Sequence, residues 1–185
     1  MTSMSRPAGP LRIGSLCTGY GGLDLAVTAV LDAELAWCAE TDRHAAAVLA
    51  ARWPAVPNLG DITAIDWDSV PAVDLITAGW PCQDISLAGP GAGLKGTRSG
   101  LWHHITRCLA QLRPPIAYLE TVAALRTRGL ARVVAELARL GYDTQWATVR
   151  ASSAGAAHAR ARLFILAVRP GHAGDLAAAA RPCRP

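Results

Sequence analysis

Short apolar runs alternate with longer segments of helical periodicity along most of the chain. The runs have the length of buried strands, and the segments between them repeat apolar positions every three or four residues. This alternation predicts an α/β fold with a mainly parallel, doubly wound sheet. The predicted strands are 11–17, 35–39, 57–62, 73–78, 116–119, 143–151 and 163–168. The predicted helices are 23–31, 43–52, 101–112 and 130–140.

A reactive side chain follows the predicted strand 73–78. The strand stops at Gly79, Pro81 restricts the loop after it, and Cys82 comes next. Open α/β sheets bind ligands beyond the carboxyl ends of their strands, so this thiol is placed where it could act as a nucleophile. The alternative interpretation is a small buried residue in a turn, which is the usual state of a free cysteine.

Four other strand ends carry residues that could bind a ligand. The first predicted strand leads into a glycine turn at 18–22, whose spacing is not that of a dinucleotide site. Glu40 ends the second strand about 20 residues later, the place of an acid that binds ribose hydroxyls. Asp61 could accept a hydrogen bond from an exocyclic amine, or could cap a turn. Glu120 ends the strand 116–119.

Composition describes a single domain with its own core. The chain has 185 residues, of which 51% are hydrophobic and 17% charged, and this balance argues against disorder. It has no apolar run of membrane-spanning length and no pattern of a signal peptide, so we expect a cytoplasmic protein without a membrane partner. Its five cysteines form no Cys-x-x-Cys pair, so neither a zinc site nor a disulfide framework is predicted. We expect a flexible arm at 1–10, the domain at 11–169 and a low-complexity tail at 170–185.

Charge is distributed unevenly along the chain. Residues 1–84 contain 4 basic and 10 acidic side chains, whereas residues 85–185 contain 14 basic and 4 acidic ones. The division predicts one face for an uncharged or cationic ligand and another for a polyanion. The alternative is a set of arginine-rich, solvated helices.

Taken in order, these residues resemble the DNA (cytosine-5)-methyltransferase family across roughly 11–168. The resemblance implies a Rossmann-like fold for S-adenosylmethionine, with an antiparallel last strand near 163–168. It also implies double-stranded DNA as the substrate and a place in restriction-modification. The similar motifs are Gly-Tyr-Gly-Gly at 19–22, Glu40, Asp61, Gly-Trp-Pro-Cys-Gln at 79–83, Arg-Ser-Gly-Leu at 98–101, Glu-Thr-Val at 120–122 and the two spaced arginines of 158–162.

The resemblance also implies a role for each matching residue. Cys82 would attack C6 of a flipped-out cytosine, Glu120 would hold N3 and the exocyclic amine, and Arg160 and Arg162 would bind O2 and adjacent phosphates. No metal is implied. S-adenosylmethionine, which leaves as S-adenosylhomocysteine, would be bound by Leu16, Cys17, Thr18, Gly19, Tyr20, Gly21, Gly22, Glu40, Thr41, Asp61, Ile62, Pro81 and Leu101.

Several positions depart from the family pattern. Cys17 stands where the family has an aromatic residue that packs on adenine, and Thr41 where it has a large apolar one. Thr121 replaces the asparagine of Glu-Asn-Val, and two alanines flank Arg160. The 17 residues after Val168 are too few for the family's target-recognition domain and final helix.

Alternative functions therefore stay open. The chain could be one half of a split enzyme whose second chain supplies recognition, or a remnant that binds cofactor or DNA without catalysis. RNA methylation is disfavoured, because the usual RNA enzymes pair a Thr-Cys nucleophile with a second cysteine.

Overall fold

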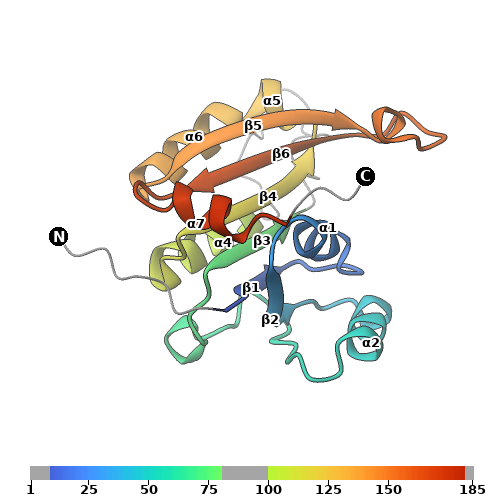
Figure 1. Cartoon of the computed structure of the whole chain (residues 1–185), viewed down its shortest axis with the longest axis vertical. Coiled ribbons are helices and arrows are strands. Elements are labelled where there is room, and N and C mark those ends of the chain that lie inside the picture. The colour runs from blue at the N-terminus through green and yellow to red at the C-terminus, as the bar shows by residue number, and fades with distance from the viewer. Residues whose placement is uncertain (1–8, 81–99, 182–185) are drawn as a thin grey trace.

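Six strands form one sheet in the part of the chain that the computed structural model describes, residues 9–80 and 100–181. They are β1 Leu11–Leu16, β2 Ala33–Ala39, β3 Leu75–Gly79, β4 Ile116–Val122, β5 Asp143–Arg150 and β6 Ala161–Val168. Their order is β2-β1-β3-β4-β6-β5 (Figure 1). Strands β1 to β4 pair in parallel, and β6 is antiparallel to both β4 and β5. The predicted mainly parallel sheet with an antiparallel last strand is confirmed.

Helices cover both faces of this sheet. Successive residues of its central strands point to opposite sides, so each face presents apolar side chains that helices can cover. In β3, Leu75 belongs to one apolar cluster and Ile76 to the other. The Leu75 cluster includes side chains of α1, α2 and α7, and the Ile76 cluster includes those of α4, α5 and α6. The helices are α1 Gly22–Val30, α2 Arg43–Arg52, α4 Gly100–Leu112, α5 Leu125–Arg128, α6 Leu130–Arg139 and α7 Ala173–Ala179, with short 3-10 turns η1 Trp67–Ser69 and η3 Ala151–Ala154.

The predicted strand at 57–62 is wrong. Only Asn58 forms a β-bridge there, with Cys38. The Asn58 side chain replaces the rest of the ladder, because its oxygen accepts the N–H groups of Glu40 and Gly60, both at 3.0 Å. Gly60 then turns the chain with a φ of 76°. The segment is a loop fastened to the end of β2 rather than a strand.

Two further predictions need correction. The strand predicted at 163–168 begins earlier, at Ala161, so Arg162 lies on β6, where it pairs with Val122 of β4 and Val149 of β5. Part of the predicted tail is helix α7, which buries Ala179. Composition alone did not predict this helix, because its end is held by a contact with a distant residue. The carbonyl of Ala179 accepts the N–H of Asp32 at 2.7 Å.

Within the described ranges, no helix is both long and apolar enough to cross a membrane. Predictions that concern Pro81 and Cys82 lie outside the described residues.

Candidate functional site

The carboxyl ends of the four parallel strands meet at one edge of the sheet. Leu16 of β1 pairs with Ala39 of β2 and Ala78 of β3, so the residues that follow these strands are neighbours. Gly79 in turn pairs with Glu120 of β4. The structure therefore brings together the strand ends that the sequence singled out, at the edge where open α/β sheets bind ligands.

The glycine turn after β1 depends on its glycines. Gly19 and Gly21 have φ values of 57° and 78°, and the N–H of Gly21 donates to the carbonyl of Thr18 at 3.0 Å. A Cβ on Gly21 would approach the ring of Trp53 to 2.5 Å. A side chain there would strain the backbone and collide with that ring, so a residue other than glycine would displace the turn.

Glu40 fastens this turn to the end of β2. One carboxylate oxygen accepts the N–H of Gly19 at 2.6 Å, and the other accepts those of Thr41 and Asp42, both at 2.8 Å. Charge-assisted bonds to backbone N–H groups are short and strong, so the carboxylate is held in a fixed orientation. Three bonds leave acceptor capacity on the carboxylate for a further donor.

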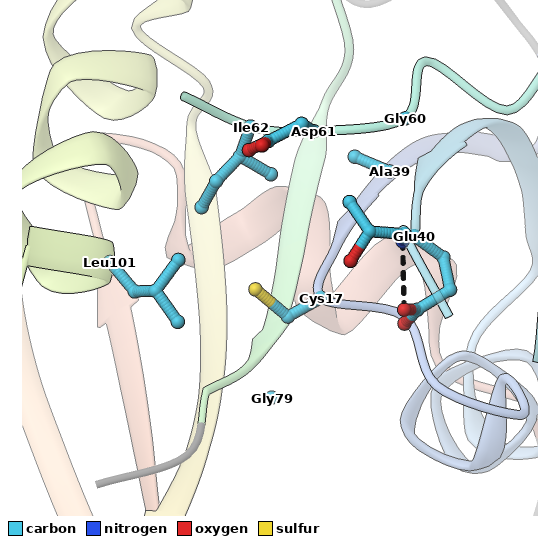
Figure 2. Close-up of a pocket in the computed structure, with 9 residues that line it drawn as sticks. Cys17, Ala39, Glu40, Gly60, Asp61, Ile62, Gly79 and Leu101 are labelled. Carbon is cyan, nitrogen blue, oxygen red and sulfur yellow. Dashed lines mark hydrogen bonds between the residues drawn. The ribbon is translucent and has the colours of Figure 1, made fainter. Parts of the chain in front are cut away.

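A cavity of about 300 Å³ opens between these elements and α4 (Figure 2). In Figure 2 the side chains of Cys17 and Leu101 point toward each other, with Asp61 and Ile62 beside them. Burial, followed by the negative charges of Glu40 and Asp61, raises the pKa of the Cys17 thiol to about 12. The lining residues are Cys17, Ala39, Glu40, Thr41, Gly60, Asp61, Ile62, Gly79 and Leu101.

Asp61 contributes an ionised carboxylate to this cavity. It accepts the N–H of Thr63 at 2.9 Å, and that bond is the main reason why the pKa of Asp61 lies below its ordinary value. A turn cap and a ligand acceptor were the two interpretations of this residue. The structure shows the cap and also places the residue in the cavity wall.

A second cavity of about 270 Å³ shares Cys17 and Gly79 with the first. Sequence reasoning missed one of its residues, Asp24, whose carboxylate is fully buried and accepts the hydroxyls of Ser15 and Thr77. Burial raises the pKa of Asp24, although both hydroxyl bonds oppose the shift. An acid inside an otherwise apolar helix was the available signal. The lining residues are Ser15, Leu16, Cys17, Thr18, Gly19, Gly22, Leu23, Asp24, Gly79 and Glu120.

Glu120 and Arg162 form an ion pair at this cavity. Arg162 Nε lies 2.7 Å from Glu120 Oε1, and about a quarter of each side chain is exposed. A Cβ added at Gly79 would come within 3.3 Å of the other carboxylate oxygen, so glycine leaves that oxygen room. Arg160 is exposed and lines neither cavity, although its carbonyl accepts the N–H of Ala151 at 2.9 Å.

The predicted cofactor residues are therefore largely gathered around two adjoining cavities. Tyr20 lines neither cavity and is 64% exposed, and Gly21 packs against Trp53 instead. Pro81 and Cys82 lie outside the described residues. The described part of the chain contains no group of three or more side chains that could hold a metal ion.

Known proteins match both the sequence and the fold. A family model described as C-5 cytosine-specific DNA methylase matches residues 11–179. The type II methyltransferase M2.BsuMI of Bacillus subtilis is 33% identical over 165 residues, which are 85% of this chain and 42% of that protein. The type II methyltransferase M.CviJI of Paramecium bursaria Chlorella virus IL3A is 39% identical over 111 residues, 59% of this chain and 30% of that protein. The chain spans less than half the length of both relatives.

Solved structures share the fold. The Dnmt2 methyltransferase of S. pombe superimposes with a TM-score of 0.72 at 19% identity, over 86% of this chain and 51% of that one. A mutant of Spodoptera frugiperda DNMT2 superimposes with a TM-score of 0.73 at 21% identity, over 88% and 51% respectively. At such identities the likeness concerns the fold alone.

Proposed function

The chain belongs to the C-5 cytosine-specific DNA methylase family, and we propose that it forms the catalytic part of an enzyme that methylates C5 of cytosine in double-stranded DNA. The observation that supports this most is the ion pair of Glu120 and Arg162 beside Gly79. Gly79 is three residues before Cys82 in the chain, and it also lines the cavity that has an acidic wall.

The first cavity fits S-adenosylmethionine, the proposed methyl donor. Its volume of about 300 Å³ is within the usual range of small-molecule sites. The carboxylates of Glu40 and Asp61 offer acceptors for ribose hydroxyls and an exocyclic amine, and Cys17 and Leu101 offer apolar walls. The two carboxylates also favour a cation over an anion. When bound, the donor supplies an electrophilic methyl group.

Cys82 is the proposed nucleophile. Its thiolate forms a bond to C6 of cytosine, and the electron pair of the C5–C6 double bond becomes available at C5. C5 then takes the methyl group as the sulfur–methyl bond of the donor breaks and S-adenosylhomocysteine leaves. A base such as water removes the C5 proton, and that electron pair re-forms the C5–C6 double bond as the C6–S bond breaks and the thiolate leaves. The atoms and electrons of this reaction therefore balance without an oxidant, a reductant or a metal.

Glu120 and Arg162 lower the barrier to that attack. Glu120 holds N3 and the exocyclic amine and shares a proton with N3, which removes the negative charge that addition places on the ring. Arg162 donates to O2 and keeps Glu120 in position through the 2.7 Å contact. Donors fixed before the reaction stabilise the developing charge without reorganisation.

The basic second half supplies the DNA contacts in this proposal. Arg126 of α5 and Arg150 of β5 are exposed, and neither 121–135 nor 144–174 contains an acidic residue. Arginines that neutralise phosphates release condensed counterions, so the affinity for DNA should fall with salt. The target base lies inside the duplex and must be flipped out before Cys82 can reach C6.

Sequence recognition is proposed to come from a further domain or a second chain. The matched relatives are more than twice as long as the region they share with this chain. Apolar side chains are also exposed beside the glycine turn, with Tyr20 at 64% and Leu25 of α1 at 39%. An apolar surface next to a ligand site is typical of a place that another segment covers.

A mechanism-based trap tests the proposed function. DNA that contains 5-fluorocytosine cannot lose its C5 substituent after methyl transfer, so the protein should remain covalently attached when S-adenosylmethionine is present. Cys82→Ser should abolish the adduct, and Glu120→Gln should slow its formation by about 10²–10⁴-fold. The assay should include any candidate second chain. An adduct that persists in Cys82→Ser would rule out the mechanism, and no adduct with any partner would favour the non-catalytic remnant.

A further inference from the structure

The Trp80 residue, which connects β3 to the segment that contains Cys82, is hydrogen-bonded on both sides. Its N–H donates to the carbonyl of Glu120 at 3.2 Å, and its carbonyl accepts the hydroxyl of Thr121 at 3.1 Å. Thr121 is 1% exposed, so the hydroxyl and its partner are shielded from solvent. Two consecutive residues of β4 thus hold the two ends of one residue.

The side chain of Trp80 is held as well. Its buried ring lies against that of Trp102 on α4, with centroids 5.1 Å apart and planes inclined by 32°. Trp102 Nε1 donates to Glu136 of α6 at 2.5 Å, and Arg132 donates to the same carboxylate at 2.8 Å. The ring contact is therefore supported by a hydrogen-bonded link between two helices.

The Thr121 bond matters more than an ordinary bond to a carbonyl because proline follows Trp80. Proline has no N–H, so the peptide between Trp80 and Pro81 can be oriented by a hydrogen bond only through its carbonyl. In a planar peptide, that carbonyl fixes the direction in which the chain continues. Cys82 follows within two residues, a reach of at most about 7 Å.

We propose that Thr121 is a positioning residue for Cys82, because its hydroxyl orients the peptide from which the Pro81-Cys82 segment starts. The inference rests on the proposed role of Cys82 as nucleophile. It gives a function to a departure from the family pattern, since threonine keeps a donor at the position where the family has asparagine.

Single-turnover formation of the 5-fluorocytosine adduct tests this role. Thr121→Val keeps the shape but removes the donor, and it should lower the rate roughly 10- to 100-fold, the usual consequence of a displaced reacting group. Thr121→Ser should stay within about threefold, because it keeps the hydroxyl. Dissociation constants for S-adenosylmethionine and DNA should be unchanged in both. The control is Thr127→Val, since the exposed Thr127 also donates to a carbonyl, at 3.3 Å, but on α5.

Alkylation by iodoacetamide without DNA separates this inference from the proposed function. Thr121→Val should change the alkylation rate of Cys82 by roughly 3- to 10-fold, whereas Thr121→Ser should not, with Cys17 and Cys38 as internal references. If the wild type forms no adduct but this difference is found, the proposed function fails and the positioning role stands. Equal alkylation rates for Thr121→Val, Thr121→Ser and the wild type would overturn the positioning role. Equal decreases in rate for Thr121→Val and Thr121→Ser would overturn it as well. Thr121→Ala replaces Thr121→Val if the latter does not fold.

Discussion

The two sides of the site differ in charge and in how their polar groups are held. On the β1–β2 side, the carboxylates of Glu40 and Asp61 accept backbone N–H groups. On the β4–β6 side, Glu120 is paired with a side chain, Arg162. Backbone donors cannot move without the fold, whereas a guanidinium can change partners by rotating a few bonds.

This difference suits the two proposed ligands. A pocket for a small cationic methyl donor requires fixed acceptors, because the shape of the donor is the same in every turnover. A site for a flipped base has to be filled and emptied, and the ion pair keeps Glu120 and Arg162 in position before the base enters. The segregation of charge also keeps the polyanion away from the acidic cavity wall.

The largest expected effect concerns Cys17, a cavity thiol that the acidic side keeps protonated. A pKa raised from 9.0 to about 12 leaves roughly 10³-fold less thiolate at pH 8 than an unperturbed cysteine has. Alkylation by iodoacetamide, followed by mass spectrometry across a pH series, should therefore be slow and should still be rising above pH 10. A plateau of the Cys17 rate near pH 9 would contradict the comparison, because it would mean that neither burial nor the two carboxylates oppose ionisation.

The next effect distinguishes the two arginines that the sequence grouped together. Arg162→Ala removes the partner of Glu120 and should lower the rate of methyl transfer by about 10²-fold, as expected for loss of a preorganised donor. Arg160→Ala is the matched control and should lower it less than about fivefold, because Arg160 lines neither cavity. Transfer of labelled methyl groups to DNA measures both. Equal losses would show that the two arginines act together.

The smallest effect tests the acidic side. Glu40→Gln weakens the bonds to Gly19, Thr41 and Asp42 and should reduce affinity for S-adenosylmethionine about 10-fold, while affinity for DNA stays the same. Glu34→Gln makes the same charge change at an exposed position of β2 and should have no effect. Isothermal calorimetry measures cofactor binding, and fluorescence anisotropy measures DNA binding. If both variants weaken the cofactor equally, overall charge rather than the Glu40 contact is responsible.

Much of the site could be predicted because the ends of the strands can be recognised in the sequence. Glu40 and Glu120 each follow an apolar run, and their convergence follows from the parallel order of the strands. Asp61 follows the turn at Gly60 and reaches the cavity on the loop that is fastened to the end of β2. Asp24 stood out only as an acid inside an otherwise apolar helix, and its role was not found because its partners, Ser15 and Thr77, lie on two different strands. The contact of Thr121 with Trp80 spans 41 residues and was equally invisible.

The sequence by itself determined the order of most strands and helices and the division of charge, since these depend on local periodicity and on composition. Its motifs, taken in order, carried the resemblance to the family. Only the tertiary structure decided which side chains act together. It paired Arg162 with Glu120 and left Arg160 exposed, because register within the sheet depends on how β6 aligns with β4. It also turned 57–62 from a strand into a loop, because the Asn58 side chain takes the place of ladder hydrogen bonds. It made 173–179 a helix whose end is held by the N–H of Asp32, a contact that composition does not reveal.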